Sequence, residues 1–245
     1  MIKSLVSVLV FVIDTLYRDR PYQRFYVLET VARVPYFSYL SVLHLYETLG
    51  WWRKADWLKV HFAEAWNELH HLLIMESLGG NKSWSDRFIA QHTALFYYWV
   101  IVALYMMAPR SAYYFMELVE GHAHHTYDTF LKENEAELKA QPAPQVAINY
   151  YRDGDLYMFD EFQSCGVPET RRPAVDNLYD VFTNIRDDEW EHVKTMVACQ
   201  QPEAQNTFKS PHTPIYREEV VVLPLVLEEK VEYIEAHQAK VKRQQ

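Results

Sequence analysis

Two Glu-x-x-His pairs are the residues of this chain whose types and spacing best suit chemistry. The first pair is Glu68 with His71, and the second is Glu189 with His192. Residues three apart share one face of an α-helix, so each pair would present a carboxylate and an imidazole in the same direction. An isolated pair is weak evidence, because about one is expected by chance in a chain so rich in glutamate and histidine. The neighbouring residues decide between a surface pair and a metal site.

The surroundings of the pairs favour a buried metal site. Glu68 stands among aromatic and leucine residues, and Glu29 and Glu120 stand alone in apolar stretches with helical spacing. Buried carboxylates are costly unless they are paired or bind a cation, and few lysines or arginines lie three or four positions away. Two Glu-x-x-His helices plus one glutamate from each of two further helices form a di-iron carboxylate site. The predicted ligands of two non-haem iron ions are Glu29, Glu68, His71, Glu120, Glu189 and His192. The same ligand types suit manganese.

Three further residues are predicted to act close to these ligands. Tyr127 follows Glu120 by seven positions, so on a helix it lies almost directly beneath it and can face the metals as a catalytic tyrosine. A tyrosine of the core would have the same spacing. Asn67 and Asp188 immediately precede ligand candidates and can serve as hydrogen-bond partners of the histidines. Asp188 can equally be a solvated charge in the run of charged residues 186–188.

The composition indicates one packed domain and excludes some partners. The chain has 245 residues, of which 49% are hydrophobic and only 6 are glycine, which suits a single domain over residues 1–245. The net charge of −9 argues against nucleic acid as a partner. With only 2 cysteines there is no disulfide framework and no Cys-x-x-Cys metal site.

The hydrophobic periodicity predicts an all-α, ferritin-like four-helix bundle with additional helices. Pro35 is expected to interrupt the first long helix, and Gly79 to end the second. A proline at position 109 suits the start of another helix. The expected helices cover about residues 22–49, 55–78, 94–108 with a start near 83–85, 109–140, 146–163 and 174–199.

Three segments are not assigned to the four bundle helices. Residues 1–17 form an apolar segment that suits a membrane surface and is too short to span a bilayer. Residues 94–108 are apolar all round, but about 15 residues fall short of the roughly 20 needed to cross. This stretch is either a buried core helix or an interfacial helix on one leaflet. Residues 201–245 are expected to be a weakly structured tail.

Four stretches carry a resemblance to a known family. The segments Leu28-Glu29-Thr30, Asn67-Glu68-Leu69-His70-His71-Leu72, Met75-Glu76-Ser77-Leu78-Gly79-Gly80-Asn81 and Arg186-Asp187-Asp188-Glu189-Trp190-Glu191-His192 resemble the plastid terminal oxidases, which belong with the alternative oxidases. The similarity runs from about residue 12 to residue 200. It implies a homodimeric, monotopic di-iron bundle on one leaflet. Such a protein oxidises plastoquinol and reduces O2 to water without pumping protons.

The resemblance also implies roles and a location. Tyr127 matches the family's tyrosine near the irons, and Arg24, Leu28 and Thr126 match the region of the quinol pocket. Because no transit peptide precedes the motifs, the expectation is either a mature or trimmed chain or one from a cyanobacterium or its phage. The expected location is the thylakoid membrane of a cyanobacterium or a plastid.

The sequence departs from the family pattern at a few positions and leaves alternatives open. Trp190 replaces a small residue and can alter packing behind the metals, the pair His124-His125 replaces an aromatic-Glu pair, and Ser77 replaces a glutamate. A di-iron hydroxylase of a membrane quinone precursor would share the ligands. A non-catalytic metal-binding bundle would share them too, whereas ribonucleotide reductases normally have an aspartate in place of one glutamate.

Overall fold

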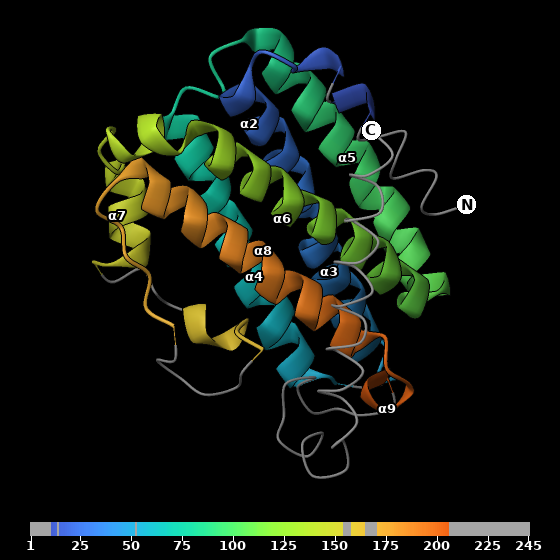
Figure 1. Ribbon diagram of the computed structural model, residues 1–245. Helices are drawn as coiled ribbons and strands as arrows, with labels where there is room; N and C mark the ends of the chain where they lie inside the picture. Colours follow the sequence, from blue (N-terminus) through green and yellow to red (C-terminus); the bar gives the residue numbers. More distant parts are fainter. Residues whose placement is uncertain (1–10, 14, 52, 154–157, 165–170, 206–245) are drawn as a thin grey trace, which may run out of the picture.

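The computed structural model describes residues 11–13, 15–51, 53–153, 158–164 and 171–205. In these ranges the chain is all-α, as predicted, and its one extended contact is an isolated bridge between Pro142 and Asn177. The elements in chain order are α2 (Pro21–Ala32), α3 (Val34–Thr48), α4 (Ala55–Ser77), α5 (Trp84–Met107), α6 (Pro109–Lys139), α7 (Gln145–Tyr151), the 3-10 turn η1 (Phe159–Glu161), α8 (Leu178–Cys199) and α9 (Pro202–Gln205) (Figure 1).

Prolines and glycines set several helix ends. Pro35 cannot donate a backbone hydrogen bond, and the predicted first helix is interrupted before it, with α2 ending at Ala32 and α3 beginning at Val34. After α4 the chain passes through Gly79 at φ +85°, a left-handed conformation that favours glycine. At Gly80 an added Cβ would stand 2.5 Å from the carbonyl oxygen of Tyr22. The end of α4 therefore touches the start of α2.

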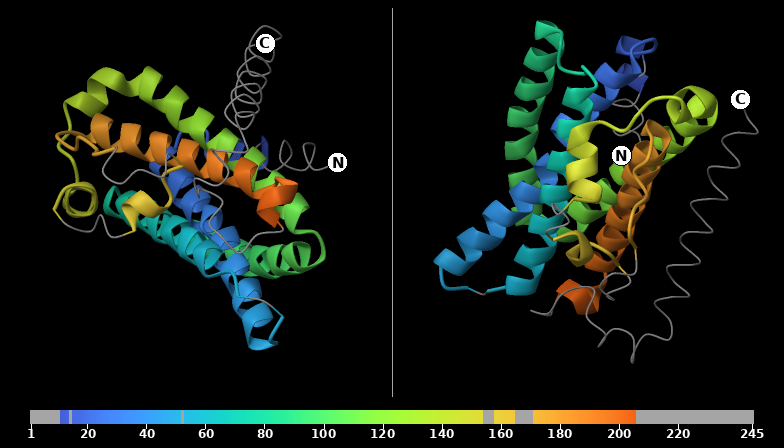
Figure 2. Two further views of the ribbon diagram at one scale, coloured as in Figure 1. Left: turned by 90° about the horizontal axis from the view of Figure 1, so that it is seen from below. Right: turned by 90° about the vertical axis from the view of Figure 1, so that its left-hand side faces the viewer.

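Helices α2, α4, α6 and α8 form the central bundle, and α3 and α5 flank it. Helices α6 and α8 lie side by side, and α2 packs against α4 (Figures 1 and 2). Helix α3 packs against α4 and α5, and α5 covers α2 and α6 from outside. One core cluster includes Phe25 stacked on Tyr127 at 4.4 Å between ring centroids, while a second gathers Tyr39, Tyr105 and Tyr113. The interval between these clusters holds the candidate site.

Helix α5 has one face on the bundle and a broad face outside. Its buried residues Asp86, Ala90, Ile101 and Tyr105 form one stripe, and only 17% of its most apolar 18-residue stretch is buried. The buried-core alternative for this segment is therefore wrong. Its bounds agree with the predicted start near residues 83–85 and end near 108. The prediction that its apolar stretch is too short to cross a membrane is wrong, because in the described part of the chain this 24-residue helix alone is long and apolar enough. Its exposed apolar residues are Trp84, Phe88, Ile89, Leu95, Phe96, Trp99, Val100, Met106 and Met107.

Two predicted helices differ from the observed ones. The segment predicted as one helix over 146–163 consists of α7, which ends at Tyr151, and the separate turn η1. Helix α8 begins at Leu178, four residues later than predicted, because the side chain of Asn177 accepts a hydrogen bond from Asp180 N and caps the first turn. Residues 1–10 of the predicted membrane-surface segment, and residues 206–245 of the predicted tail, lie outside the described residues.

Candidate metal centre

The four bundle helices bring the six predicted ligands together. Helix α2 supplies Glu29 and α6 supplies Glu120, while α4 and α8 each supply one Glu-x-x-His pair. Every one of these side chains is at most 2% exposed, which decides against surface pairs. The helical spacing inferred from the sequence is therefore realised in a closed interior. The six residues are Glu29, Glu68, His71, Glu120, Glu189 and His192.

The six residues form two overlapping groups, each with three carboxylates and one imidazole. In each group one ligand atom per residue lies within 4.8 Å of all the others. The Nδ1 atom of His71 is 3.3 Å from Glu189 Oε1 and 3.8 Å from Glu68 Oε1. The Nδ1 atom of His192 is 3.0 Å from Glu68 Oε1 and 3.5 Å from Glu189 Oε2. Because Glu68 and Glu189 belong to both groups, each can link two ions.

The electrostatics of the cluster fit bound cations. Both carboxylate oxygens of Glu68 and of Glu189 are buried without a hydrogen-bond partner among the described residues. Burial raises the pKa of Glu68 and Glu120, and the negative charge of the adjacent Glu189 raises both further. Ionised carboxylates crowded in this way repel one another unless positive charge lies between them. Oxygen and imidazole donors in these numbers suit two ions such as iron or manganese.

Two tyrosines bind the carboxylates of the two lone glutamates in a crosswise arrangement. Tyr127 of α6 donates its hydroxyl hydrogen bond to Glu29 Oε1 of α2. Tyr36 of α3 donates to Glu120 Oε1 of α6 at 2.5 Å. Each tyrosine lies seven positions after one glutamate and binds the other. Tyr127 was predicted from the sequence and Tyr36 was not, although Tyr36 follows Glu29 by the same seven positions.

A buried aspartate orients one of the histidines. The Nε2–H group of His71 donates to Asp188 Oδ2 at 3.0 Å, which leaves Nδ1 for a metal. Burial alone would raise the pKa of Asp188, but the Arg171 guanidinium and the His71 hydrogen bond lower it below its usual range, so the group stays ionised. The solvated-charge alternative for Asp188 is wrong. Asn67 does not bond a histidine as expected, since its amide donates to Asp188 Oδ2 at 2.9 Å.

The three predicted quinol-binding residues lie at different places. Arg24 lines a cavity of about 290 Å³ together with residues of the N-terminal segment. Leu28 packs against the bundle core. Thr126 is buried on α6, where its hydroxyl lies 3.3 Å from His122 Nε2. The structure therefore places one of the three in this cavity and does not bring all three together there.

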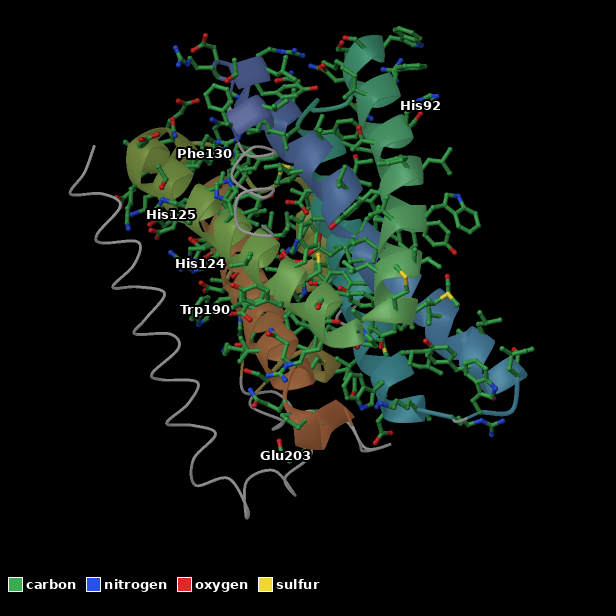
Figure 3. The ribbon with its side chains drawn as sticks, turned by 90° about the vertical axis from the view of Figure 1, so that its right-hand side faces the viewer. His92, His124, His125, Phe130, Trp190 and Glu203 are labelled. Atoms are coloured by element: carbon green, nitrogen blue, oxygen red, sulfur yellow. The ribbon has the colours of Figure 1, made fainter. Side chains whose placement is uncertain are left out.

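The departures from the family pattern lie on the outside of the bundle. Figure 3 shows His124 and His125 on the outer side of α6, with Trp190 of α8 beside them. The rings of His124 and Trp190 are 5.1 Å apart. Trp190 is partly exposed, so it does not pack behind the carboxylates, as the sequence had suggested. Ser77 is also exposed, at the end of α4.

A four-helix bundle with two Glu-x-x-His helices and two single glutamates defines the class of ferritin-like carboxylate metal proteins. Within that class, residues 2–201 match the model of the family described as alternative oxidase. The chain therefore belongs to the alternative oxidase family.

Individual relatives agree with this placement. The chain is 64% identical over 202 residues to ubiquinol oxidase 4, chloroplastic/chromoplastic, of Arabidopsis thaliana, covering 82% of this chain and 57% of that protein. It is 31% identical over 180 residues to the mitochondrial ubiquinol oxidase 2 of Glycine max, covering 73% of this chain and 48% of that protein. The chain thus spans about half the length of these curated relatives.

Proposed function

We propose that the protein is a quinol oxidase that couples the oxidation of two quinols to the four-electron reduction of O2 to two waters, without pumping protons. The observation that carries the proposal is the pair of overlapping Glu and His groups, fully buried and sharing Glu68 and Glu189. Membership of the alternative oxidase family and the names of the relatives, which are ubiquinol oxidases, support it. Plastoquinol is the proposed donor, because the most similar of these two relatives is named as chloroplastic.

The proposed cofactor is a pair of non-haem iron ions held by the six buried residues. Bound iron supplies the redox chemistry that connects quinol to oxygen. Four carboxylates balance the four positive charges of two divalent ions, and the two imidazoles complete the set. Glu68 and Glu189 would contact both ions, since each belongs to both groups. Glu29 and His71 would hold one ion, and Glu120 and His192 would hold the other.

The surrounding side chains fix the donors and hold protons. Asp188 fixes the tautomer of His71 by accepting its Nε2–H bond, and Asn67 and Tyr151 fix Asp188 in turn with bonds of 2.9 and 2.7 Å. Tyr127 holds a proton at Glu29 Oε1 and is the proposed catalytic tyrosine. Arg24, Leu28 and Thr126 are proposed to contact quinol, with Arg24 at the cavity that it lines together with Phe11, Thr15 and Tyr17.

The proposed setting is one leaflet of a plastid membrane. Helix α5 lies along the bundle rather than projecting from it (Figures 1 and 2), and its apolar outer residues face away from the protein. Such a face suits immersion in a single leaflet. The chloroplastic relative favours a plastid membrane over the cyanobacterial origin also considered. A homodimer is proposed from the family resemblance.

Oxygen uptake by the iron-loaded protein in detergent, with a short-chain plastoquinol as donor, tests this function. We expect one O2 consumed per two quinols, with quinone as the organic product by mass spectrometry. Insertion of oxygen into the quinol would instead identify a hydroxylase. No uptake by a protein that retains its irons would contradict the oxidase and favour a non-catalytic metal-binding bundle.

A further inference from the structure

A second buried polar cluster lies one helical turn from the candidate metal centre. Glu64 precedes Glu68 by four positions on α4, so the two share a face of the helix. Its Oε2 atom is 2.7 Å from Nδ1 of His61, and both residues are 0% exposed. Neither residue belongs to the six predicted metal ligands, and neither has a role in the function proposed above.

The cluster continues through two tyrosines. The Nε2 atom of His61 is 2.8 Å from the hydroxyl of Tyr113 on α6. That hydroxyl is 2.8 Å from the hydroxyl of Tyr105 on α5. Four side chains from three helices therefore form one continuous hydrogen-bonded chain, which we call the Glu64–Tyr105 chain. Its inner end is beside the metal centre, and its outer end is on the helix whose opposite face is exposed and apolar.

The inner end has an unused acceptor position. Glu64 Oε1 is buried and has no hydrogen-bond partner among the described residues. The carboxyl group is electrostatically close to the metal centre, since the charge of His192 acts on the pKa of Glu64 and the charge of Glu64 acts on Tyr36. A buried oxygen of this kind costs free energy unless it has a partner during function.

Glu64 and His61, at the inner end of the chain, are both uncharged at neutral pH. Burial raises the pKa of Glu64 to about 8. Burial also lowers the pKa of His61 to about 3, with a further decrease from the charge of Lys54. A protonated carboxyl group hydrogen-bonded to a neutral imidazole avoids two buried charges. The other titratable groups that act on these side chains or on Tyr113 are His192, Cys199, Tyr39 and Tyr105.

We propose that Glu64 takes protons from quinol and gives them to the reacting oxygen at the metal centre, and that His61, Tyr113 and Tyr105 hold its carboxyl group in position. The inference rests on the proposed quinol oxidation, because that reaction needs four protons per O2 and releases two from each quinol. Two quinols therefore supply all four protons, and Glu64 ends each cycle with the proton it began with. Tyr105, at the outer end of the chain, is 3% exposed, so the proposal takes no proton from water at that end.

Glu64 can exchange a proton at one oxygen while its other oxygen stays hydrogen-bonded. Its Oε2 atom remains paired with His61 Nδ1, and imidazole accepts at one nitrogen while it donates at the other. Tyr113 and Tyr105 continue the hydrogen bonds from His61 Nε2, since a phenol hydroxyl both donates and accepts. Glu64 therefore takes up and releases a proton at Oε1, the atom without a partner among the described residues.

Three variants separate this role from a structural one. Glu64→Gln keeps the shape of the side chain but cannot exchange its protons, and Glu64→Asp retains an acid. Tyr113→Phe interrupts the chain between His61 and Tyr105. Tyr39→Phe is the matched control, because Tyr39 packs against Tyr113 and Tyr105 but its hydroxyl donates to the carbonyl of Ala112, outside the chain.

We expect Glu64→Gln to lower kcat by about 100-fold, at the low end of general acid–base effects, with iron content and KM for quinol unchanged. Glu64→Asp should recover part of the rate. Tyr113→Phe should lower kcat less, and Tyr39→Phe should leave it unchanged. Wild-type kcat in both Glu64→Gln and Tyr113→Phe would overturn the proposal. If Glu64→Gln fails to fold, Tyr113→Phe and the spectroscopic measurement decide.

The spectroscopic measurement is independent of turnover. Infrared spectra of the iron-loaded full chain should contain the carbonyl band of a buried, protonated carboxyl group. The band should be absent in Glu64→Gln and should decline as the pH is raised through about 8, where the pKa of Glu64 lies. A spectrum without a Glu64-dependent band would overturn the proposal even if quinol is oxidised. If the wild type does not oxidise quinol, the proposed function fails, while the band still tests whether Glu64 stores a proton.

Discussion

The bundle interior and the outer face of α5 are opposite in character. In the interior, four carboxylates and two imidazoles are at most 2% exposed and crowd within a few ångströms of one another. On α5, Phe96 is 73% exposed and Met107 is 78% exposed. Each region reverses the usual distribution, in which charges face water and large apolar side chains are buried.

Both regions are unfavourable unless a further component contacts them. Buried carboxylates without donors are unfavourable unless cations lie among them. An extended apolar surface is unfavourable in water unless another apolar phase covers it. The chain alone satisfies neither region, so we infer that metal ions complete the first and a lipid leaflet the second. Each partner can be removed separately by mutation.

The largest expected effect comes from the interior. Replacing the bridging residue in Glu189→Ala removes an oxygen ligand from both groups, so we expect iron to be lost and quinol turnover to be abolished. Iron content by atomic absorption and oxygen uptake are the measurements. Glu191→Ala is the matched control on α8, because Glu191 binds Ser164 and Lys194 rather than the site. Retention of iron and activity in Glu189→Ala would remove this residue from the ligand set.

A smaller effect is expected on the outer face of α5. Phe96→Ser together with Trp99→Ser removes two large apolar side chains that are 73% and 63% exposed. Burial of such a side chain contributes about 1.5–3 kcal/mol. If these side chains are partly immersed in lipid, the double variant should bind lipid vesicles about tenfold or more weakly than the wild type, as measured by sedimentation. Phe62→Ser, at an exposed phenylalanine of α4, is the control. Equal binding by the double variant would contradict immersion of this face.

The sequence was sufficient to predict residues whose positions follow from the helical period. Glu68 and His71 fall on one face because they are three apart on one helix, and the same holds on α8. Their apolar neighbours indicated that these faces were buried. The interruption before Pro35 followed from a missing backbone donor. These inferences need no knowledge of how the helices pack.

Contacts between separate elements could not be derived in this way. Arg171 binds Asp188 from an irregular segment before α8, and nothing in its local sequence indicates that the two meet. Tyr113 and His61 are 52 positions apart, so their hydrogen bond depends on how α4 and α6 pack. The order His61-x-x-Glu64 is visible in the sequence, but the spacing alone does not show that the pair is buried or that it meets Tyr113. The apolar length of α5 was underestimated because only residues 94–108 are apolar all round, whereas the helix begins at Trp84.

The central claim is that two metal ions occupy the two overlapping groups. Anomalous diffraction at the iron edge from crystals of the iron-loaded protein tests it most directly. We expect two peaks per chain, one between Glu29, His71 and the bridging pair Glu68 and Glu189, and the other between Glu120, His192 and the same pair. A single peak, or none, in a protein that oxidises quinol would contradict the account.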